Sequence, residues 1–351
     1  MSAAYAPEYP FPDPVPAGEA REVAPGVHWL RMALPFALDH INLWLLEDQG
    51  GWTIVDTGLG DAATRGSWEK VFASRIGGAP VRRVLVTHYH PDHAGNAAWL
   101  CQRTGAELWM TRGEYLTVHA ARHGAAGYSP EAQQHLFRAN GLDPAQANAL
   151  LARGGLYRNL VPDFPLSHRR LFEGERLSIG GRVWRVMLGY GHAPEHASLY
   201  CESINVLISG DMLLPRISTN VAVRPIDPMS NPLRSFLDSV RRYRDLPEDV
   251  LVLPSHGLPF RGAHGRIAQL ERHHADRLRE LEAACAVSPR SAADVLEILF
   301  RRKLDTGQIF FAMGEAIAHL HCLHFDGRLA RTVGPDGIAR FAPAGQAAAT
   351  G

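Results

Sequence analysis

The sequence predicts a layered α/β domain followed by a smaller helical module. Short apolar runs typical of β-strands alternate with helical stretches in two successive groups, one before residue 112 and one after residue 181. Histidines and aspartates follow directly after several of these runs, where open α/β sheets place their binding groups. After Gly265 the strand-like runs give way to amphipathic helices. The expected architecture is therefore one large domain with a small one appended.

The first group of elements begins after a proline-rich amino terminus. Residues 1–20 lack the apolar stretch of a signal peptide, and we expect a disordered or surface-draped tail. Gly50-Gly51 supplies a turn between two of the strand-like runs that follow. The strands of this group are predicted at residues 27–34, 41–47, 52–56, 83–87 and 107–111, and its helices at 62–74 and 96–103.

Residues 112–170 have a different character. They are helical in pattern, rich in alanine, histidine and arginine, and interrupted by glycines and prolines, which is typical of an inserted lid. Strands resume at residues 182–188, 198–202, 206–209 and 250–254, with a helix at 232–243. The main domain is thus predicted to span residues 21–265.

The last part of the chain, residues 266–351, is predicted to be a separate winged-helix-like module. Helices are expected at residues 266–285, 292–300 and 310–326. They are followed by a hairpin over residues 332–340 that turns at Pro335-Asp336-Gly337.

Composition narrows the class of protein. The 351 residues are 46% hydrophobic and 21% charged, which suits a globular protein with a sizeable core. The 36 basic and 36 acidic residues balance, so no global field attracts nucleic acid or an anionic membrane. No run reaches the roughly 18 apolar residues that a membrane helix needs. The four widely spaced cysteines are predicted to be free thiols, which indicates a reducing compartment, the cytoplasm.

The segment from Thr87 to His93, Thr-His-Tyr-His-Pro-Asp-His, carries the strongest chemical signal. Side chains two residues apart in an extended segment share a direction, so His88 and His90 can converge on one metal ion. Pro91 ends the extension, and the turn that follows aims Asp92 and His93 at a second position. Imidazole nitrogens with carboxylate oxygens form a ligand set that suits zinc, and also iron or manganese.

Further candidate ligands follow later strand-like runs. His192, Asp211 and His256 each stand just past the end of an apolar run, and Asp56 ends the run at residues 52–56 in the same way. Any one of the eighteen histidines is more often a surface or core residue than a ligand. An HxHxDH motif after an apolar strand, followed in order by Gly-His, Gly-Asp and Ser-His, arises by chance in fewer than roughly one case in twenty.

His88–His93 matches the HxHxDH signature of the metallo-β-lactamase superfamily. The other motifs of the superfamily are matched in order by Asp56-Thr-Gly58, Gly191-His192, Gly210-Asp211 and His256-Gly257. The resemblance covers residues 21–265 and implies an αββα sandwich with the site at one edge. The part after residue 265 resembles the winged-helix-like extension of a subgroup of these hydrolases.

The resemblance also implies roles for individual residues. It implies that His88, His90 and His192 hold a first metal ion. It implies that Asp92, His93 and His256 hold a second. Asp211 would bridge the two ions, and Asp56 and His196 would orient ligands from behind them. The expected cofactor is two zinc ions per chain, with iron or manganese as alternatives.

The implied reaction is hydrolysis of a small-molecule substrate. A water shared by two ions loses its proton near neutral pH and attacks, while a metal ion polarises the substrate oxygen. Asp92 and Asp211 are the candidate catalytic residues, and Asp92 would serve as a proton shuttle in a site with one metal. Motif spacing resembles the glyoxalase II-like branch most, which favours a thioester or other activated ester. Ala193 and Glu195 depart from that branch's Gly-His-Thr-Pro-Gly-His, and its basic glutathione contacts have no match here.

Two other functions stay open. A mononuclear iron oxygenase that acts on persulfides keeps much of the same motif. An endoribonuclease or nucleic-acid-binding hydrolase is the other alternative, because winged-helix-like folds often bind nucleic acid. Residues 266–345 carry no basic stripe interleaved with aromatic residues, so we expect this module to form a homodimer or to close the pocket.

The substrate pocket is predicted from residues 34–38, the 112–170 insert and residues 216–228. Phe36 would provide an apolar wall. Arg216 and Arg224 are candidates to anchor a carboxylate or phosphate by paired hydrogen bonds. Tyr89 and Tyr190 flank ligand histidines and are candidate donors to an oxyanion.

Overall fold

The computed structural model describes residues 5–151 and 155–345. The remaining parts of the predicted tail, insert and C-terminal module lie outside the described residues. The chain divides into two compact units. The first comprises Met1–Arg122, Leu156–Thr219 and Ser239–Ile267, and the second comprises His123–Gly155, Asn220–Asp238 and Ala268–Gly351.

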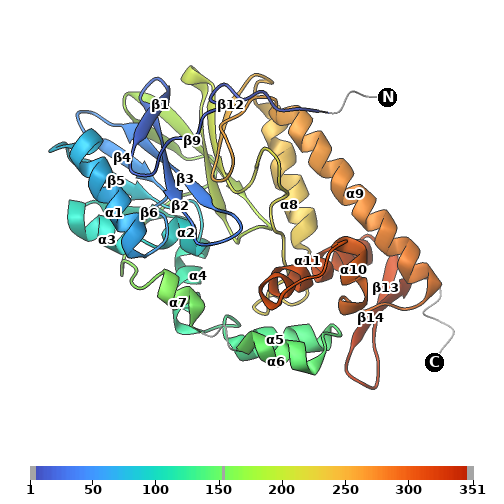
Figure 1. Cartoon of the computed structure of the whole chain (residues 1–351). Helices are drawn as coiled ribbons and strands as arrows, with labels where there is room; N and C mark the ends of the chain where they lie inside the picture. Colours follow the sequence, from blue (N-terminus) through green and yellow to red (C-terminus); the bar gives the residue numbers. More distant parts are fainter. Residues whose placement is uncertain (1–4, 152–154, 346–351) are drawn as a thin grey trace. The chain divides into compact units, whose positions relative to one another are not determined.

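Two β-sheets form the frame of the first unit (Figure 1). Among the described residues, one sheet has seven strands in chain order: β1 (Ala20–Ala24), β2 (Val27–Ala33), β3 (His40–Glu47), β4 (Trp52–Val55), β5 (Val81–Leu85), β6 (Glu107–Met110) and β7 (Arg169–Arg170). Strands β1 to β4 pair antiparallel, and β4 to β7 pair in parallel. Parallel pairing from β4 onward brings the carboxyl ends of β4, β5 and β6 to one edge.

The second sheet has the strand order β12 (Leu251–Pro254), β11 (Val206–Gly210), β10 (His196–Cys201), β9 (Arg182–Gly189) and β8 (Arg176–Ile179). Its strands pair antiparallel except β11 and β12, which are parallel. Side chains of both sheets form one buried core cluster, with Trp29 and Trp44 on one side and Trp184 and Val186 on the other. The prediction of a layered α/β fold is therefore confirmed.

Helices of the first unit connect these strands. They are α1 (Ala62–Val71), the π-helix η1 (Phe72–Ile76), α2 (Pro91–Ala94), α3 (Ala97–Thr104), α4 (Arg112–His123), α7 (Leu156–Leu160) and the 3₁₀-helices η2 (Glu202–Ile204) and η3 (Arg242–Asp245). Helix α4 reaches one residue beyond this unit. Asp61 caps α1 by accepting a hydrogen bond from the amide of Thr64 at 2.7 Å. Pro91 occupies the first turn of α2, where its missing N–H costs nothing.

The amino-terminal segment, predicted as a loose tail, packs onto the first unit over residues 5–19. Val15 is buried in the core cluster and Phe11 packs against it. The amide of Arg261 donates to the carbonyl of Glu8 at 2.9 Å. The ring of Tyr5 lies so close to Gly265 that a Cβ there would come within 2.3 Å of it, so this position requires glycine.

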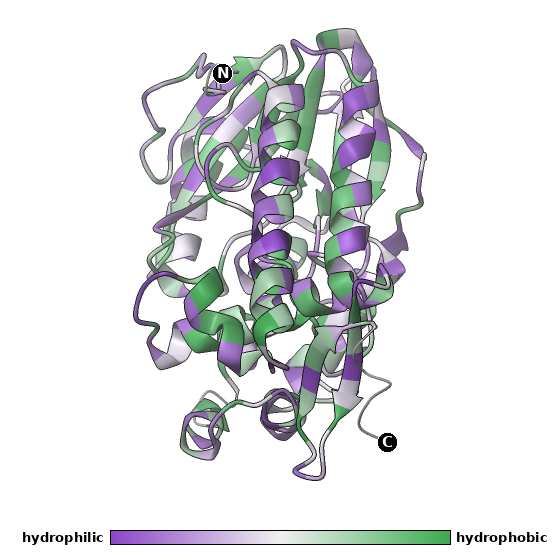
Figure 2. Cartoon of the chain, turned by 90° about the vertical axis from the view of Figure 1, so that its right-hand side faces the viewer, coloured by the Kyte–Doolittle hydropathy of each residue, from purple (hydrophilic) through white to green (hydrophobic). Residues whose placement is uncertain are grey.

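The second unit is mainly helical. It contains α5 (Pro130–Ala139), α6 (Pro144–Leu151), most of α8 (Pro232–Arg241) and α9 (Ala263–Val287), the 3₁₀-helix η4 (Ala293–Val295), α10 (Leu296–Leu299) and α11 (Thr306–Phe325), and the hairpin β13 (Leu329–Val333) and β14 (Ala339–Pro343). Helix α9 carries buried apolar residues such as Ile267, Leu270 and Leu281 among charged ones. Figure 2 shows hydrophilic and hydrophobic residues interleaved along the long helices that face the viewer. Helix α11 begins with a capping box formed by Asp305 and Gln308. Most residues of its interior are buried, mainly apolar ones together with His319 and His321, and they form the core of this unit.

The predicted insert is divided between the two units. Helices α4 and α7 lie largely or wholly in the first unit, whereas α5 and α6 belong with the C-terminal helices. The hairpin expected at residues 332–340 is present, with Val333 opposite Ala339. All four cysteines are free thiols, as predicted. Among the described residues, no helix combines the length and apolar character needed to span a membrane.

Candidate metal centre

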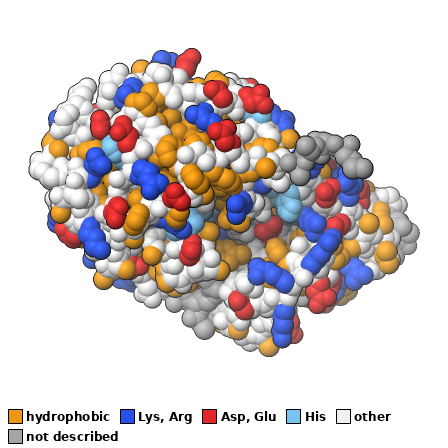
Figure 3. All heavy atoms as spheres, turned by 45° about the horizontal axis from the view of Figure 1, so that its top comes forward, with side chains coloured by type: hydrophobic (Ala, Val, Ile, Leu, Met, Phe, Trp, Pro, Cys, Tyr) orange, Lys and Arg blue, Asp and Glu red, His pale blue; other side chains and the backbone are white. Residues whose placement is uncertain are grey.

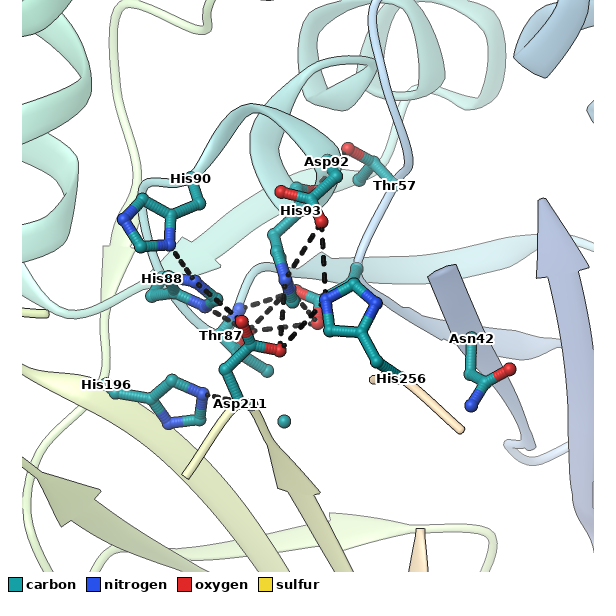
Figure 4. Close-up of polar contacts among 12 residues, drawn as sticks. Asn42, Thr57, Thr87, His88, His90, Asp92, His93, His196, Asp211 and His256 are labelled. Atoms are coloured by element: carbon teal, nitrogen blue, oxygen red, sulfur yellow. Dashed lines mark hydrogen bonds and ion pairs between the residues drawn. The ribbon is translucent and has the colours of Figure 1, made fainter. Parts of the chain in front are cut away.

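The candidate centre lies where strands of both sheets of the first unit end. Asp56 follows β4, His88 follows β5, His192 follows β9, Asp211 follows β11 and His256 follows β12. Helix α2 begins directly after His90 and brings Asp92 and His93 back toward the same point. Figure 4 shows side chains from these segments converging. The two sheets thus contribute jointly to a single cluster.

A first group of four ligand atoms comes from His88, His90, His192 and Asp211. The Nε2 atom of His88 lies 2.9 Å from Nδ1 of His90 and 3.2 Å from Nε2 of His192. Oδ2 of Asp211 lies 3.3 Å from Nε2 of His192. One ligand atom of each residue falls within 4.8 Å of the others, which is compact enough for one metal ion.

A second group comes from Asp92, His93 and His256. Oδ2 of Asp92 lies 3.7 Å from Nε2 of His93 and 3.5 Å from Nε2 of His256. The other carboxylate oxygen of Asp211, Oδ1, lies 3.5 Å from Nε2 of His93 and 3.4 Å from Nε2 of His256. Asp211 therefore presents one oxygen to each group, which is the geometry required of a bridging carboxylate.

The chemistry of the donor atoms fits divalent metal ions. Nε2 of His93 and Oδ1 of Asp211 are buried and make no hydrogen bond, although they face each other. A buried polar atom without a partner is costly, and a cation between these atoms would satisfy both. Imidazole nitrogens and carboxylate oxygens are also the donors that zinc, iron and manganese accept.

Asp56 holds His93 from behind. Its Oδ1 accepts from the amide of Thr87 at 2.8 Å, and its Oδ2 accepts from Oγ1 of Thr87 at 2.9 Å and from Nδ1 of His93 at 2.8 Å. Because a carboxylate only accepts, Nδ1 of His93 carries a proton and Nε2 faces the centre (Figure 4). Asp56 has a φ of +62°, a conformation that costs about 1 kcal/mol or more for a residue other than glycine.

His256 is oriented by a network that sequence reasoning missed. Its Nδ1 donates to the carbonyl of His40 at 2.8 Å. The amide of Gly257 donates to Nε2 of His40 at 2.8 Å, and Nδ1 of His40 donates to Asp39 at 2.6 Å. Asn42 donates to the carbonyls of residues 254 and 257, each at 2.8 Å, and so fixes both sides of the same turn.

His196 supports the bridging carboxylate through the backbone. Its Nε2 accepts from the amide of Asp211 at 3.1 Å. Gly210 has a φ of +55°, and a Cβ there would come within 2.3 Å of the His196 ring. The glycine before Asp211 is therefore needed for this close approach.

Burial and charge act against each other at the centre. Burial lowers the pKa of His88 well below its usual value, and the neighbouring histidines add to this effect. Burial also acts to lower the pKa of His93, but three aspartates, Asp56 foremost, hold it well above its usual value. Burial acts to raise the pKa of Asp211, but His256 and His93 hold it well below its usual value. Because a histidine binds a metal ion only in its neutral form, metal binding at this centre should depend on pH.

Glu114 is another residue at the centre that carries no sequence signal. It lies in the first turn of α4 and is fully buried. Its Oε2 accepts from the amide of Tyr89 at 2.9 Å, and its Oε1 accepts from the amide of Glu195 at 2.6 Å. Burial acts to raise the pKa of Glu114, and the two amides that donate to its oxygens act to lower it. Tyr157 supports the same motif by donating its hydroxyl to the carbonyl of Tyr89 at 2.5 Å.

The predicted substrate contacts have varied surroundings. Phe36 is 49% exposed and Tyr190 is 41% exposed, whereas Tyr89 is buried and stacks on Tyr157. Nε of Arg216 donates to the hydroxyl of Tyr9 at 3.3 Å, and its guanidinium lies 5.5 Å from the centre of the Tyr9 ring. Arg224 belongs to the second unit, where it lies over the ring of Phe310.

The fold and the ligand groups define a metal-dependent hydrolase, and the chain belongs to the metallo-beta-lactamase superfamily. The sequence profile of the metallo-beta-lactamase superfamily matches residues 37–256. The profile of the metallo-beta-lactamase-like C-terminal domain matches residues 278–344. The crystal structure of a beta-lactamase domain protein from Burkholderia ambifaria is 50% identical, with a TM-score of 0.90. That match covers 96% of this chain and 98% of the other.

Two further relatives support the assignment. The crystal structure of a metallo-beta-lactamase family protein from Thermus thermophilus is 31% identical and has a TM-score of 0.76. The match covers 92% of this chain and 100% of the Thermus thermophilus chain. A Bacillus subtilis (strain 168) protein named "Probable metallo-hydrolase YqjP" is 25% identical over 302 residues. This match covers 84% of this chain and 91% of that protein.

Proposed function

We propose that this chain binds two divalent metal ions, zinc foremost, and hydrolyses a thioester or another activated ester. The observation that carries the proposal is the placement of Asp211. Its two oxygens face two separate groups of ligand atoms, at 3.3 Å from His192 on one side and 3.4 Å from His256 on the other. A site for a single ion does not need a carboxylate in this position.

Two ions held here supply, when bound, a water of lowered pKa and a Lewis acid for the substrate oxygen. The residues of the chain orient the ligand atoms and carry protons. His93 and His256 donate their Nδ1 protons to Asp56 and to the carbonyl of His40, which turns both Nε2 atoms toward Asp211. The Asp92 side chain is 18% exposed, compared with 10% for Asp211. With two ions Asp92 serves as a ligand, and in a site with one ion it is the carboxylate better placed to pass a proton between the centre and solvent.

The surroundings favour a small substrate with an apolar part. Phe36 and Tyr190 offer exposed aromatic surface on segments next to the ligand segments, Phe36 before β3 and Tyr190 two residues before His192. On the face drawn in Figure 3, acidic side chains lie among the basic ones, which does not favour nucleic acid. We also propose a cytoplasmic location, which the four free thiols support.

The test combines elemental analysis of the purified protein with a panel of thioester, ester, lactone, phosphodiester and RNA substrates. We expect about two zinc ions per chain and thioester or ester turnover that chelators abolish. One iron per chain with oxygen consumption and no hydrolysis would replace the proposal with a persulfide oxygenase. Cleavage of RNA alone would replace it with an endoribonuclease. Homodimerisation through the C-terminal module, residues 266–351, stays a prediction, which sedimentation can test.

A further inference from the structure

The junction between β6 and α4, here the Thr111–Glu114 segment, binds two ligand segments at once. Both carboxylate oxygens of Glu114 are used, Oε2 by the amide of Tyr89 and Oε1 by the amide of Glu195. Tyr89 stands between the two histidines of the HxH pair, and Glu195 stands three residues after His192. One buried carboxylate therefore joins two parts of the chain that are far apart in sequence.

Glu195 returns the contact. Its Oε2 accepts from the amide of Gly113 at 2.8 Å, and its carbonyl accepts from Oγ1 of Thr111 at 2.9 Å. A Cβ at Gly113 would come within 2.9 Å of the Glu195 side chain, so this close approach suits a glycine. Glu195 is one of the two positions at which this chain departs from the glyoxalase II-like motif. Its side chain thus has a structural task here that a glycine could not perform.

The two ligand segments arise from different sheets. The HxH pair follows β5 of the seven-stranded sheet, and His192 lies between β9 and β10 of the other sheet. A backbone hydrogen bond from the amide of Ala197 to the carbonyl of Thr87, at 2.9 Å, joins these segments at a second point. The first group of ligand atoms draws on both segments, whereas the histidines of the second group come from α2 and from the turn after β12.

We propose that Glu114 is a positioning residue. Together with Thr111, Gly113 and Glu195 it sets the separation of the HxH pair from His192, and so tunes the first metal position selectively. This inference rests on the proposed function, because it requires those histidines to bind metal. The outcome for metal binding follows from hydrogen-bond chemistry. Glu114→Gln leaves one acceptor oxygen and turns an NH₂ group toward the other amide, so that two donors face each other.

The experiment compares Glu114→Gln with a matched control, Asp48→Asn. Asp48 is also a buried carboxylate and accepts from Oγ1 of Thr53 at 2.9 Å, the amide of Gly180 at 3.2 Å and Arg83 at 3.0 Å. It follows the end of β3 that is opposite to His40, about 25 Å from His40 at the rise of an extended strand. Both variants make the same chemical change, but only Glu114→Gln touches the ligand segments.

Metal-free proteins would be titrated with zinc and cobalt against a chelator, with His90→Ala and His256→Ala assigning each binding step to its group. We expect Glu114→Gln to weaken metal binding at the first group, called the first step here, about 10- to 100-fold. It should also shift the absorption of cobalt bound at that group. The second step should change less than about threefold, and Asp48→Asn should change neither. Equal weakening of both steps, or the same loss in Asp48→Asn, would overturn the inference.

Hydrogen exchange of the metal-free proteins gives a second readout that needs no metal. Glu114→Gln should speed exchange at the amides of Tyr89 and Glu195, and Asp48→Asn should leave both as in the wild type. A wild-type chain that binds no metal would refute the proposed function, whereas unchanged exchange in Glu114→Gln would refute the positioning role of Glu114. If Glu114→Gln does not fold, Thr111→Val removes a single hydrogen bond. It should weaken the first step about three- to tenfold, and an unchanged first step would overturn the inference.

Discussion

Replacing Asp56 by asparagine should move a proton to the wrong nitrogen of His93. One Asp56 oxygen accepts from the amide of Thr87, and the other accepts from both the Thr87 hydroxyl and Nδ1 of His93. Asparagine keeps a single acceptor oxygen. If this oxygen keeps accepting from the backbone amide of Thr87, the NH₂ group of the asparagine faces His93 and forces Nδ1 of His93 to accept. The proton then resides on Nε2, the atom that faces Asp211 at 3.5 Å.

The expected magnitude follows from the lost interaction. A hydrogen bond to a charged group contributes about 1.5–3 kcal/mol. Loss of a residue that orients a metal ligand typically weakens metal binding by about 10- to 100-fold. We therefore expect Asp56→Asn to weaken the second binding step by that factor. The opposite placement of the asparagine would set its NH₂ against the Thr87 amide and would also be unfavourable.

The assay is chelator competition on metal-free protein, with thermal unfolding measured separately to detect misfolding. Thr87→Val is the control, because it removes the Thr87 hydroxyl and leaves the hydrogen bond between Asp56 and His93 in place. That hydroxyl also lies 3.1 Å from Nδ1 of His88 and 3.3 Å from Nδ1 of His93. Thr87→Val should weaken the second step by a smaller factor than Asp56→Asn does. Wild-type metal affinity in Asp56→Asn, with the fold intact, would refute the assignment of the His93 tautomer.

Three further outcomes are expected. Asp211→Asn should lose at least about 100-fold in kcat/KM while circular dichroism stays unchanged, and a fully active variant would remove Asp211 from its bridging role. Zinc at about one hundred times its dissociation constant should raise the free energy of unfolding by ~2.7 kcal/mol, and a chelator should reverse the gain in calorimetry. Burial raises the pKa of Glu315 in the second unit from 4.5 to about 7. The stability of the wild type should therefore fall as the pH rises between these values. Glu315→Gln should match the wild type near pH 4 and exceed it by up to about 3 kcal/mol near pH 8 in denaturant titrations, whereas equal stability at both pH values would contradict the shift.

The sequence predicted the fold class and the residues that converge, because both depend on local patterns. Apolar runs mark the strands, and ligands that follow strands running in the same direction meet at one edge. His88, His192 and Asp211 could be named for this reason. The amino-terminal segment shows the limit of composition. Its prolines predict a loose tail, but Val15 and Phe11 are apolar enough to hold it against the core.

The supporting residues could not be predicted, because their partners are distant in sequence. Glu114 bonds to Tyr89 and Glu195, which are 25 and 81 residues away. His40 accepts from Gly257, which is 217 residues away. Neither residue sits in a motif, and a single glutamate in a helix or histidine at a strand start has many ordinary explanations. Glu195 was the one available signal, since it departs from the expected motif.

The position of β12 has a consequence for how the protein is made. This strand is the edge of its sheet and pairs in parallel with β11. The ribosome completes His88, His90, His192 and Asp211 before it reaches β12, and His256 emerges only after that strand. On the proposed function, a nascent chain holds all ligands for its first metal ion while its second site is still incomplete. Docking of one edge strand would then complete the second group of ligands.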